Sequence, residues 1–155
     1  MQHNLALLAA LALSTAVPAA ALAQPQPTPP DYYVGVGIRA GLNDPTAFVI
    51  DSKAKLLELG SSRTTLSARP SVLFEDNTEL RLPLTVDFAV NPSIYPYAGA
   101  GVAYNADGGS RVDPMITAGL DFGVARNLVL DINLSTLFKP GNADTEFTAT
   151  INYEF

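Results

Sequence analysis

The stretch T-E-F-T-A-T-I-N-Y-E-F, from Thr145 to Phe155, decides the fold. Side chains along a β-strand point alternately to opposite faces. One face of this segment is apolar and holds Phe147, Ala149, Ile151, Tyr153 and Phe155. The other face is polar and holds Glu146, Thr148, Thr150, Asn152 and Glu154. A strand with so one-sided a face must lie against an apolar medium, and the rest of the chain indicates that this medium is lipid.

The same period of two runs through residues 31–155. Clusters of Gly, Pro, Asn and Asp divide them into eight extended segments. These segments are about 32–40, 47–56, 63–74, 78–90, 94–104, 112–124, 128–138 and 145–155. The connections are too short for parallel crossovers, so we expect antiparallel neighbours in chain order. Hairpins between even-numbered apolar faces need odd-length loops, and 75–77, 91–93 and 125–127 each supply three residues. Asn77 and Asn127, last in their loops, are expected in the left-handed conformation.

The two faces differ in composition along all eight segments. The apolar faces are rich in Leu, Val, Ile and Ala, with aromatic residues near the segment ends and with Ser52 and Thr136 as exceptions. The opposite faces carry glycines and equal numbers of acidic and basic residues. These are Arg39, Lys53, Lys55, Arg63, Arg69 and Arg81 with Asp51, Glu79, Asp87, Asp121, Asp131 and Glu154. The net charge of −6 is therefore expected in the connections and strand ends.

This pattern predicts an all-β protein, an eight-stranded antiparallel up-and-down transmembrane β-barrel. The interior of such a barrel is only wide enough to be filled by side chains, where charges survive if they are paired. Glycines would make room for long arginines, and terminal aromatics suit a membrane interface. The alternative is a soluble lipocalin-like calyx with the apolar set inside, binding an apolar ligand. More than thirty apolar side chains would crowd that interior, which favours the membrane barrel. Pro70, Pro83 and Pro96 are expected at bulges or towards strand ends.

The first residues indicate export. Leu5 to Leu13 is a short apolar run, and Ala21-Leu22-Ala23 is a cleavage pattern of the A-x-A type. We expect a signal peptide, residues 1–23, cleaved after Ala23. The alternative is an uncleaved anchor, but the run is short for the roughly 20 apolar residues of a membrane span. A Pro-rich linker, Q-P-Q-P-T-P-P, occupies 24–30, and the barrel domain occupies 31–155.

With the P-Y-A-G-A-G-V-A-Y stretch at Pro96 to Tyr104 and the terminal I-N-Y-E-F, the chain resembles the small eight-stranded outer-membrane barrels of the OmpA-like superfamily. The resemblance implies the outer membrane of a diderm bacterium, in contact with lipid and lipopolysaccharide. It also implies that Tyr153 and Phe155 form the signal that the barrel-assembly machinery recognises. Both termini would face the periplasm, so that the first, third, fifth and seventh connections face outward.

The inventory of reactive side chains is poor. The chain has no Cys, and its one histidine is His3. A disulfide framework, a Cys-based zinc site and a His-based triad in the barrel are therefore excluded. The acidic balance argues against nucleic acid. We assign no catalytic residue, metal ligand or cofactor.

The outward connections are rich in acids. They carry Asp44, Glu75, Asp76, Asp107, Asp113, Asp144 and Glu146 against Arg111 and Lys139. Such a rim could share divalent cations with lipopolysaccharide phosphates, but ordinary solubilising charge is the interpretation we favour.

The sequence thus predicts a monomeric, non-catalytic envelope protein whose lumen is plugged by ion pairs. Arg81 should lie beside Glu79 and Arg69 and reach Asp87, Asp121 or Asp131 across the lumen. A narrow channel for ions or small solutes is the alternative. An adhesin is disfavoured because the outward loops are short.

Overall fold

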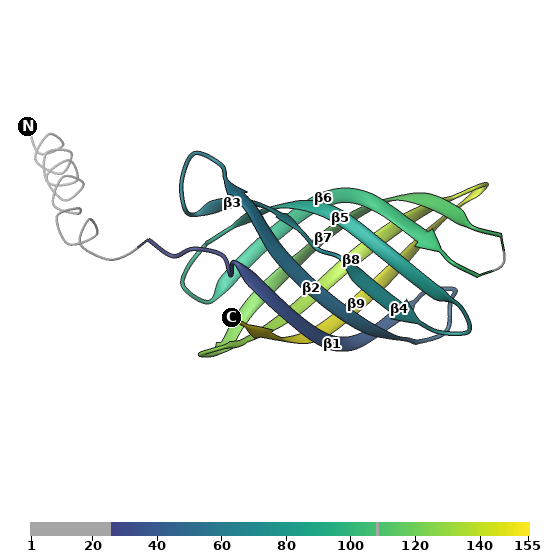
Figure 1. Cartoon of the computed structure of the whole chain (residues 1–155), viewed down its shortest axis with the longest axis horizontal. Coiled ribbons are helices and arrows are strands. Elements are labelled where there is room, and N and C mark those ends of the chain that lie inside the picture. The colour runs from purple at the N-terminus through teal and green to yellow at the C-terminus, as the bar shows by residue number, and fades with distance from the viewer. Residues whose placement is uncertain (1–25, 108) are drawn as a thin grey trace, which may run out of the picture.

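A computed structural model describes residues 26–107 and 109–155. Its strands are β1 (Tyr32–Gly41), β2 (Ala47–Glu58), β3 (Thr64–Ala68), β4 (Ser71–Phe74), β5 (Thr78–Phe88), β6 (Ile94–Asn105), β7 (Arg111–Ala125), β8 (Leu128–Lys139) and β9 (Asn142–Glu154) (Figure 1). Within these two ranges no helix is long and apolar enough to cross a bilayer. The predicted signal peptide, with Ala21 and Ala23, lies outside the described residues. Residues 26–30 of the predicted linker belong to no helix or strand.

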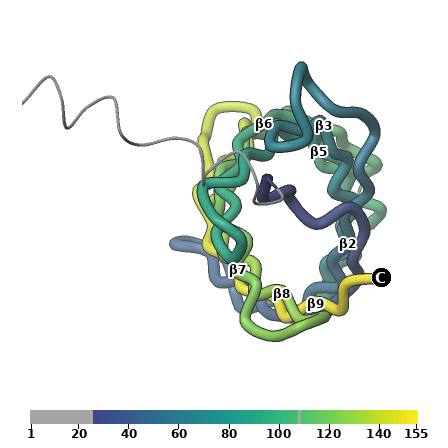
Figure 2. The backbone as a smooth tube through the Cα atoms, turned by 90° about the vertical axis from the view of Figure 1, so that its left-hand side faces the viewer, coloured from purple at the N-terminus to yellow at the C-terminus, as the bar shows by residue number. Residues whose placement is uncertain are grey.

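The strands close into a ring, as Figure 2 shows. β1 pairs with β2 on one side and with β9 on the other, and the ring continues through β8, β7, β6 and β5. β3 and β4 lie end to end between β2 and β5, so they are two halves of one wall strand. All pairings are antiparallel, and the prediction of an eight-membered up-and-down barrel is confirmed. We call the end with connections 42–46, 75–77, 106–110 and 140–141 the loop end, and the opposite end the terminus end.

The break between β3 and β4 falls at a proline, as predicted. Pro70 has no N–H for the ladder, and the Ser52 N–H and hydroxyl both donate to its carbonyl, at 3.1 and 2.8 Å. This explains the polar side chain of Ser52 on the apolar face. Pro83 was expected near a bulge or strand end but lies in the middle of β5. It is tolerated there because its missing donor faces the break, where its carbonyl accepts the Arg69 N–H at 3.0 Å.

The turns correct several local predictions. The three-residue turn at 75–77 is confirmed. β7 and β8 are joined by only two residues, and a bulge between Gly123 and Ala125 keeps the apolar side chains of both strands on the same face. β9 begins at Asn142, earlier than predicted, after a two-residue turn whose Gly141 has φ of 78°. The left-handed conformation expected of Asn77 and Asn127 is wrong, since the only described non-glycine residue with positive φ is Ser110.

The outer face of the barrel is apolar and the interior is polar. Among the described residues, thirty large apolar side chains are exposed, while the buried side chains include nineteen polar ones against eleven apolar ones. The calyx, which placed the apolar set inside, is therefore wrong, and the fold is that of a membrane-spanning barrel. Thr136, the second polar exception, shares a 3.0 Å hydrogen bond with the Thr145 hydroxyl beside it.

Two glycines show why a position without a Cβ atom is needed in the wall. A Cβ atom on Gly99 would lie 1.9 Å from the carbonyl oxygen of Leu84, so this glycine permits the wall to curve tightly at β5 and β6. A Cβ atom on Gly119 would lie 2.5 Å from the hydroxyl of Tyr97. The glycines thus make room for neighbouring backbone and a tyrosine, not for the arginines that the sequence suggested.

Candidate functional site

Arg69 lies at the break between β3 and β4, and its guanidinium pairs with carboxylates of other strands at the centre of the lumen. Its Nη2 lies 2.8 Å from Asp121 Oδ2 and also bonds Asp87 Oδ1. Lys53 Nζ lies 3.3 Å from Asp87 Oδ1 and 3.6 Å from Asp121 Oδ2. All four side chains are buried. We call Lys53, Arg69, Asp87 and Asp121 the central cluster. It joins strands from several sides of the ring, so its two cations and two carboxylates occupy the middle of the lumen.

Two tyrosines complete this layer. The Arg69 guanidinium stacks on the ring of Tyr97, with its carbon 3.5 Å from the ring centroid. The Tyr97 hydroxyl donates to Asp131 Oδ1 at 2.6 Å, and the Tyr33 hydroxyl donates to Asp121 Oδ1 at 3.0 Å. Sequence reasoning missed both tyrosines. Their odd numbers, on the polar faces of β1 and β6, were the signal that could have identified them.

A second group of ion pairs lies nearer the loop end. Arg81 bonds Glu79 on its own strand and Glu146 on β9. Arg39 Nη1 lies 2.8 Å from Glu146 Oε1, and Arg39 Nη2 bonds Glu75. We call these five residues the outer cluster. The prediction that Arg81 reaches Asp87, Asp121 or Asp131 is wrong, because the carboxylate that pairs with Arg81 across the lumen is that of Glu146.

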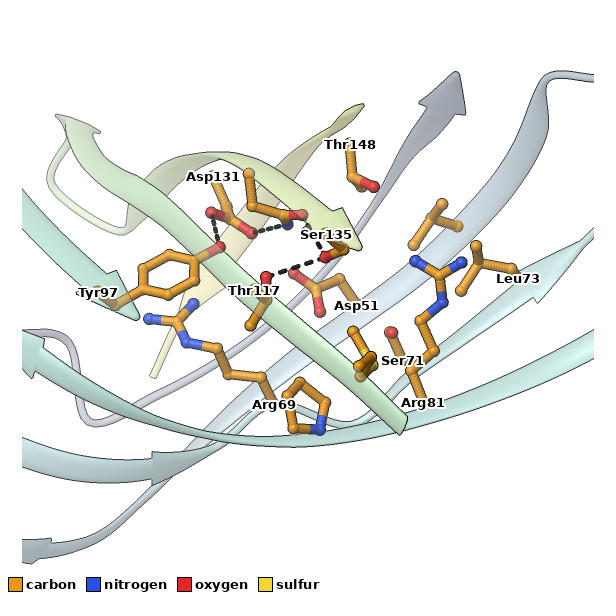
Figure 3. A pocket seen from close by; sticks show the side chains of 14 residues that line it. Asp51, Arg69, Ser71, Leu73, Arg81, Tyr97, Thr117, Asp131, Ser135 and Thr148 are labelled. Atoms are coloured by element: carbon orange, nitrogen blue, oxygen red, sulfur yellow. Dashed lines mark hydrogen bonds between the residues drawn. The ribbon is translucent and has the colours of Figure 1, made fainter. Parts of the chain in front are cut away.

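A small polar cavity separates the two clusters. It has a volume of about 30 Å³ and is lined by Arg69 towards one end and Arg81 towards the other (Figure 3). That is room for one or two water molecules. Val49, Leu73 and Met115 also line it, and they belong to two small groups of buried apolar side chains inside the barrel. Both ionic and apolar side chains thus line the lumen.

Asp51 and Asp131 line this cavity without a cation. Asp51 accepts from the Ser52 N–H at 2.9 Å and from the Thr150 hydroxyl at 3.3 Å. Asp131 is bound by Tyr97 and by the Asn133 amide at 3.2 Å. No Lys or Arg nitrogen of the described residues lies within 4.0 Å of either carboxylate. Hydrogen bonds are the direct contacts of these two acids, and the positive charge of Arg69 stabilises both from a longer distance.

The alternation of side chains predicted Lys55, Arg63 and Glu154 in the lumen, but all three lie at the rim of the terminus end. Lys55 Nζ bonds Asp31 at 2.7 Å, just before β1. Arg63, in the turn before β3, donates to the Ala89 carbonyl at 2.9 Å. Glu154 is the last residue of β9 and is only partly buried. They are near enough to water to be solvated, because the wall strands end there.

The charge inside the barrel does not balance, which corrects the sequence prediction. In the described part of the chain, the buried charged side chains are four cations and seven carboxylates: Arg39, Lys53, Arg69 and Arg81 with Asp51, Asp87, Asp113, Asp121, Asp131, Asp144 and Glu146. Asp113, Asp144 and Glu146 were assigned to outward loops. Asp113 and Glu146 lie on the inward faces of the predicted strands 112–124 and 145–155, and the early start of β9 at Asn142 adds Asp144 to the wall.

The mouth at the loop end is also ionic. Lys139 Nζ lies 2.9 Å from Asp144 Oδ2 and 3.4 Å from Asp44 Oδ2. The hydrogen bond with Asp144 raises the pKa of the Asp44 carboxyl, since the two acids can share a proton. A cavity of about 300 Å³ lies at this end, lined by residues of connections 42–46 and 75–77 and by Arg39, Glu79 and Glu146.

No protein-family model and no curated protein matches the chain, but solved structures match its fold. A designed transmembrane β-barrel matches with a TM-score of 0.63 and 20% identity, over 85% of this chain and 99% of the design. Ail, an outer-membrane protein of Yersinia pestis, matches in a phospholipid bilayer nanodisc with a TM-score of 0.59 and 11% identity, over 82% of this chain and 100% of Ail. The chain has the fold of a small outer-membrane β-barrel.

That fold serves more than one activity. The outer membrane enzyme PagL matches with a TM-score of 0.57 and 14% identity, over 79% of this chain and 99% of PagL. A designed barrel, Ail and an enzyme thus share one architecture. The likeness therefore describes the fold, and the activity must be argued from the residues of this chain.

Proposed function

We propose that the protein is a non-catalytic integral barrel of the outer membrane of a diderm bacterium, with a structural role in the cell envelope. Its apolar outer face contacts lipid and, in the outer leaflet, lipopolysaccharide. The loop end faces outward and both termini face the periplasm. The barrel is monomeric, and its lumen is plugged by ion pairs.

The proposal that the lumen is plugged rests on one observation: Arg81 bonds Glu146 from the opposite side of the ring. Both side chains are buried, at 6% and 2% exposed. Removing one partner of such a pair leaves an unpaired charge in a poorly solvated space, which costs about 3–5 kcal/mol. The pair therefore resists opening, and Leu73 beside it adds an apolar contact on the same path.

The non-catalytic role rests on the side chains available. A His-activated nucleophile is excluded between 26 and 155, since the one histidine is His3. The hydroxyls inside the barrel, such as Thr117 and Ser135, bond each other at 2.9 Å. They have acids but no base of suitable pKa beside them.

A narrow channel is the second candidate. The cavities of about 300 Å³ at the mouth and about 30 Å³ inside lie on either side of the outer cluster. Arg81 lines the inner cavity, and Leu73 lines both cavities, so a joint rearrangement of these side chains would be needed to connect them. Efflux of potassium from loaded liposomes would distinguish the two functions: the plug predicts the rate of protein-free liposomes, and the channel predicts a faster one.

Assembly is proposed to depend on the signal peptide, residues 1–23, and on Tyr153 and Phe155. The two rings lie edge to face with centroids 5.5 Å apart, and both are exposed on the outer face. They are therefore accessible to the barrel-assembly machinery.

Membrane fractionation tests the proposed location. The protein should be recovered with the outer membrane, and unboiled protein should migrate differently from boiled protein on a denaturing gel. Recovery as a detergent-free monomer in the periplasmic fraction would contradict the proposal.

A further inference from the structure

The segment before β1 is buried at the terminus end of the barrel. The sequence assigned residues 24–30 to a linker, yet Pro29 and Pro30 are buried, whereas residues 26–28 are wholly or partly exposed. Figure 2 views the barrel from this end and shows the segment, in dark purple, within the outline of the ring. Figure 1 shows the same segment entering β1 at the terminus end. We call residues 26–31 the strap, and it lies across this mouth of the barrel.

Asp31 fastens the strap to the wall. Its carbonyl oxygen accepts the Lys55 N–H at 2.7 Å, and its Oδ1 lies 2.7 Å from Lys55 Nζ. Both contacts are at the point where the strap passes into β1. Within the described residues, no backbone hydrogen bond joins 26–30 to a strand. The strap can therefore swing away from the mouth about Asp31 without breaking the ring of strands.

Two consecutive prolines suit a segment that covers an opening. A proline has no N–H, so its burial leaves no backbone donor without a partner. Its φ is already fixed near −65°, so less conformational freedom is lost when the segment becomes ordered. Each buried ring also removes apolar surface from water, which favours the ordered position. Pro29 and Pro30 can thus be buried at the mouth without adding a strand to the wall.

Apolar side chains lie on the inner face at the same end. Ala89, just after β5, is 0% exposed, and Val129, the second residue of β8, is 1% exposed. Tyr95, the second residue of β6, is also buried. Side chains so near the end of the wall would meet water if the mouth were open. The loop end differs, since its mouth holds the cavity of about 300 Å³ and the Asp44 and Glu75 side chains that line it are partly exposed.

We propose that the strap is a lid that closes the terminus-end mouth and opens about Asp31. This closure deepens the proposed function of a plugged barrel and rests on it for the orientation in the membrane. It is a second closure, because a covering segment and not an ion pair forms it. The ion pairs occupy the lumen within the wall, and the strap keeps periplasmic solutes from reaching the central cluster.

Thiol labelling tests the lid, because the chain has no Cys and a single introduced one is the only thiol. Val129→Cys places the reporter inside the mouth, and Ser61→Cys, in the exposed connection 59–63 at the same end, gives the rate without a cover. The probe is a sulfonated dye maleimide, too large to pass an eight-stranded lumen. It is applied to protein purified from membranes into phosphatidylcholine nanodiscs. Val129→Cys should react at least about a hundredfold more slowly than Ser61→Cys.

Replacing both buried prolines with glycine should open the lid. The double variant Pro29→Gly, Pro30→Gly loses two apolar rings and gains backbone freedom, so labelling of Val129→Cys should rise at least about tenfold. Pro45→Gly is the matched control, since Pro45 is exposed in connection 42–46 at the opposite end. It should leave the labelling rate within about twofold. Each variant is first checked for folding by its mobility on an unboiled gel.

Either of two results would overturn the lid. One is labelling of Val129→Cys as fast as that of Ser61→Cys while the strap is intact. The other is a double variant that changes the rate no more than Pro45→Gly does. Potassium efflux from liposomes separates the lid from the ion-pair plug: fast labelling of Val129→Cys without efflux would remove the lid and leave the plug. Efflux that appears only in the double variant would support the lid and contradict the plug.

Discussion

Arg81 on β5 and Glu146 on β9 meet across the lumen from strands that stand on opposite sides of the ring. They are 65 positions apart in the sequence, and each also has a second ionic partner: Glu79 for Arg81 and Arg39 for Glu146. The pair therefore connects the two halves of the wall through a network.

Replacing Arg81 with Ala should destabilise the barrel. The change leaves Glu146 with Arg39 alone and costs about 3–5 kcal/mol of the free energy of unfolding. Urea unfolding in lipid vesicles measures this loss.

Lys55→Ala is the control for that change. Lys55 pairs with Asp31 at 2.7 Å, and the two side chains are 22% and 44% exposed. The loss of Lys55 should cost less than about 1 kcal/mol, because water reaches both groups of the pair. Equal losses for Arg81→Ala and Lys55→Ala would show that burial of the outer cluster contributes nothing.

Two glycine-to-alanine changes test the curvature of the wall. Gly99→Ala places a Cβ atom 1.9 Å from the Leu84 carbonyl oxygen, so β5 and β6 must separate at a cost of at least about 1–3 kcal/mol. On Gly123 the nearest atom lies at 3.7 Å, and Gly123→Ala should change the free energy of unfolding by less than about 0.5 kcal/mol. A folded yield of Gly99→Ala equal to that of Gly123→Ala would contradict the close approach.

The terminal strand offers a test of assembly in cells. The Phe155 N–H donates to the Tyr32 carbonyl at 3.2 Å, so the last residue joins the closing pair β1 and β9. Phe155→Ala should lower the amount of assembled barrel far more than Glu154→Ala, because it removes the exposed terminal ring. Quantifying folded protein in outer membranes measures this. If both variants assemble like the wild type, the terminal aromatic has no part in recognition.

The fold could be predicted because alternation and turn length constrain each other. A loop with the wrong parity would have put Leu80 and Val72, which pair across β5 and β4, on opposite faces. If the alternation of inward and outward side chains had been followed to the ends of the strands, the sequence would also have placed Asp113 and Glu146 inside the barrel. Asp144 could not be placed, because the sequence does not reveal that Pro140 and Gly141 alone make the last turn.

The partners inside the lumen were not predictable from the sequence. Register gives neighbours along the wall, such as Arg81 and Ser71, whereas Arg81 finds Glu146 through strand tilt and side-chain reach. The same limit applies to Arg69, whose stacking on Tyr97 depends on the space that Gly119 leaves for the tyrosine.

Conductance of the wild-type protein in a planar lipid bilayer tests the plugged lumen most directly. Because both the central and the outer cluster lie across the lumen, the account predicts a current indistinguishable from that of the protein-free bilayer. Stable, ion-selective openings of the wild type would contradict the plug and establish the channel.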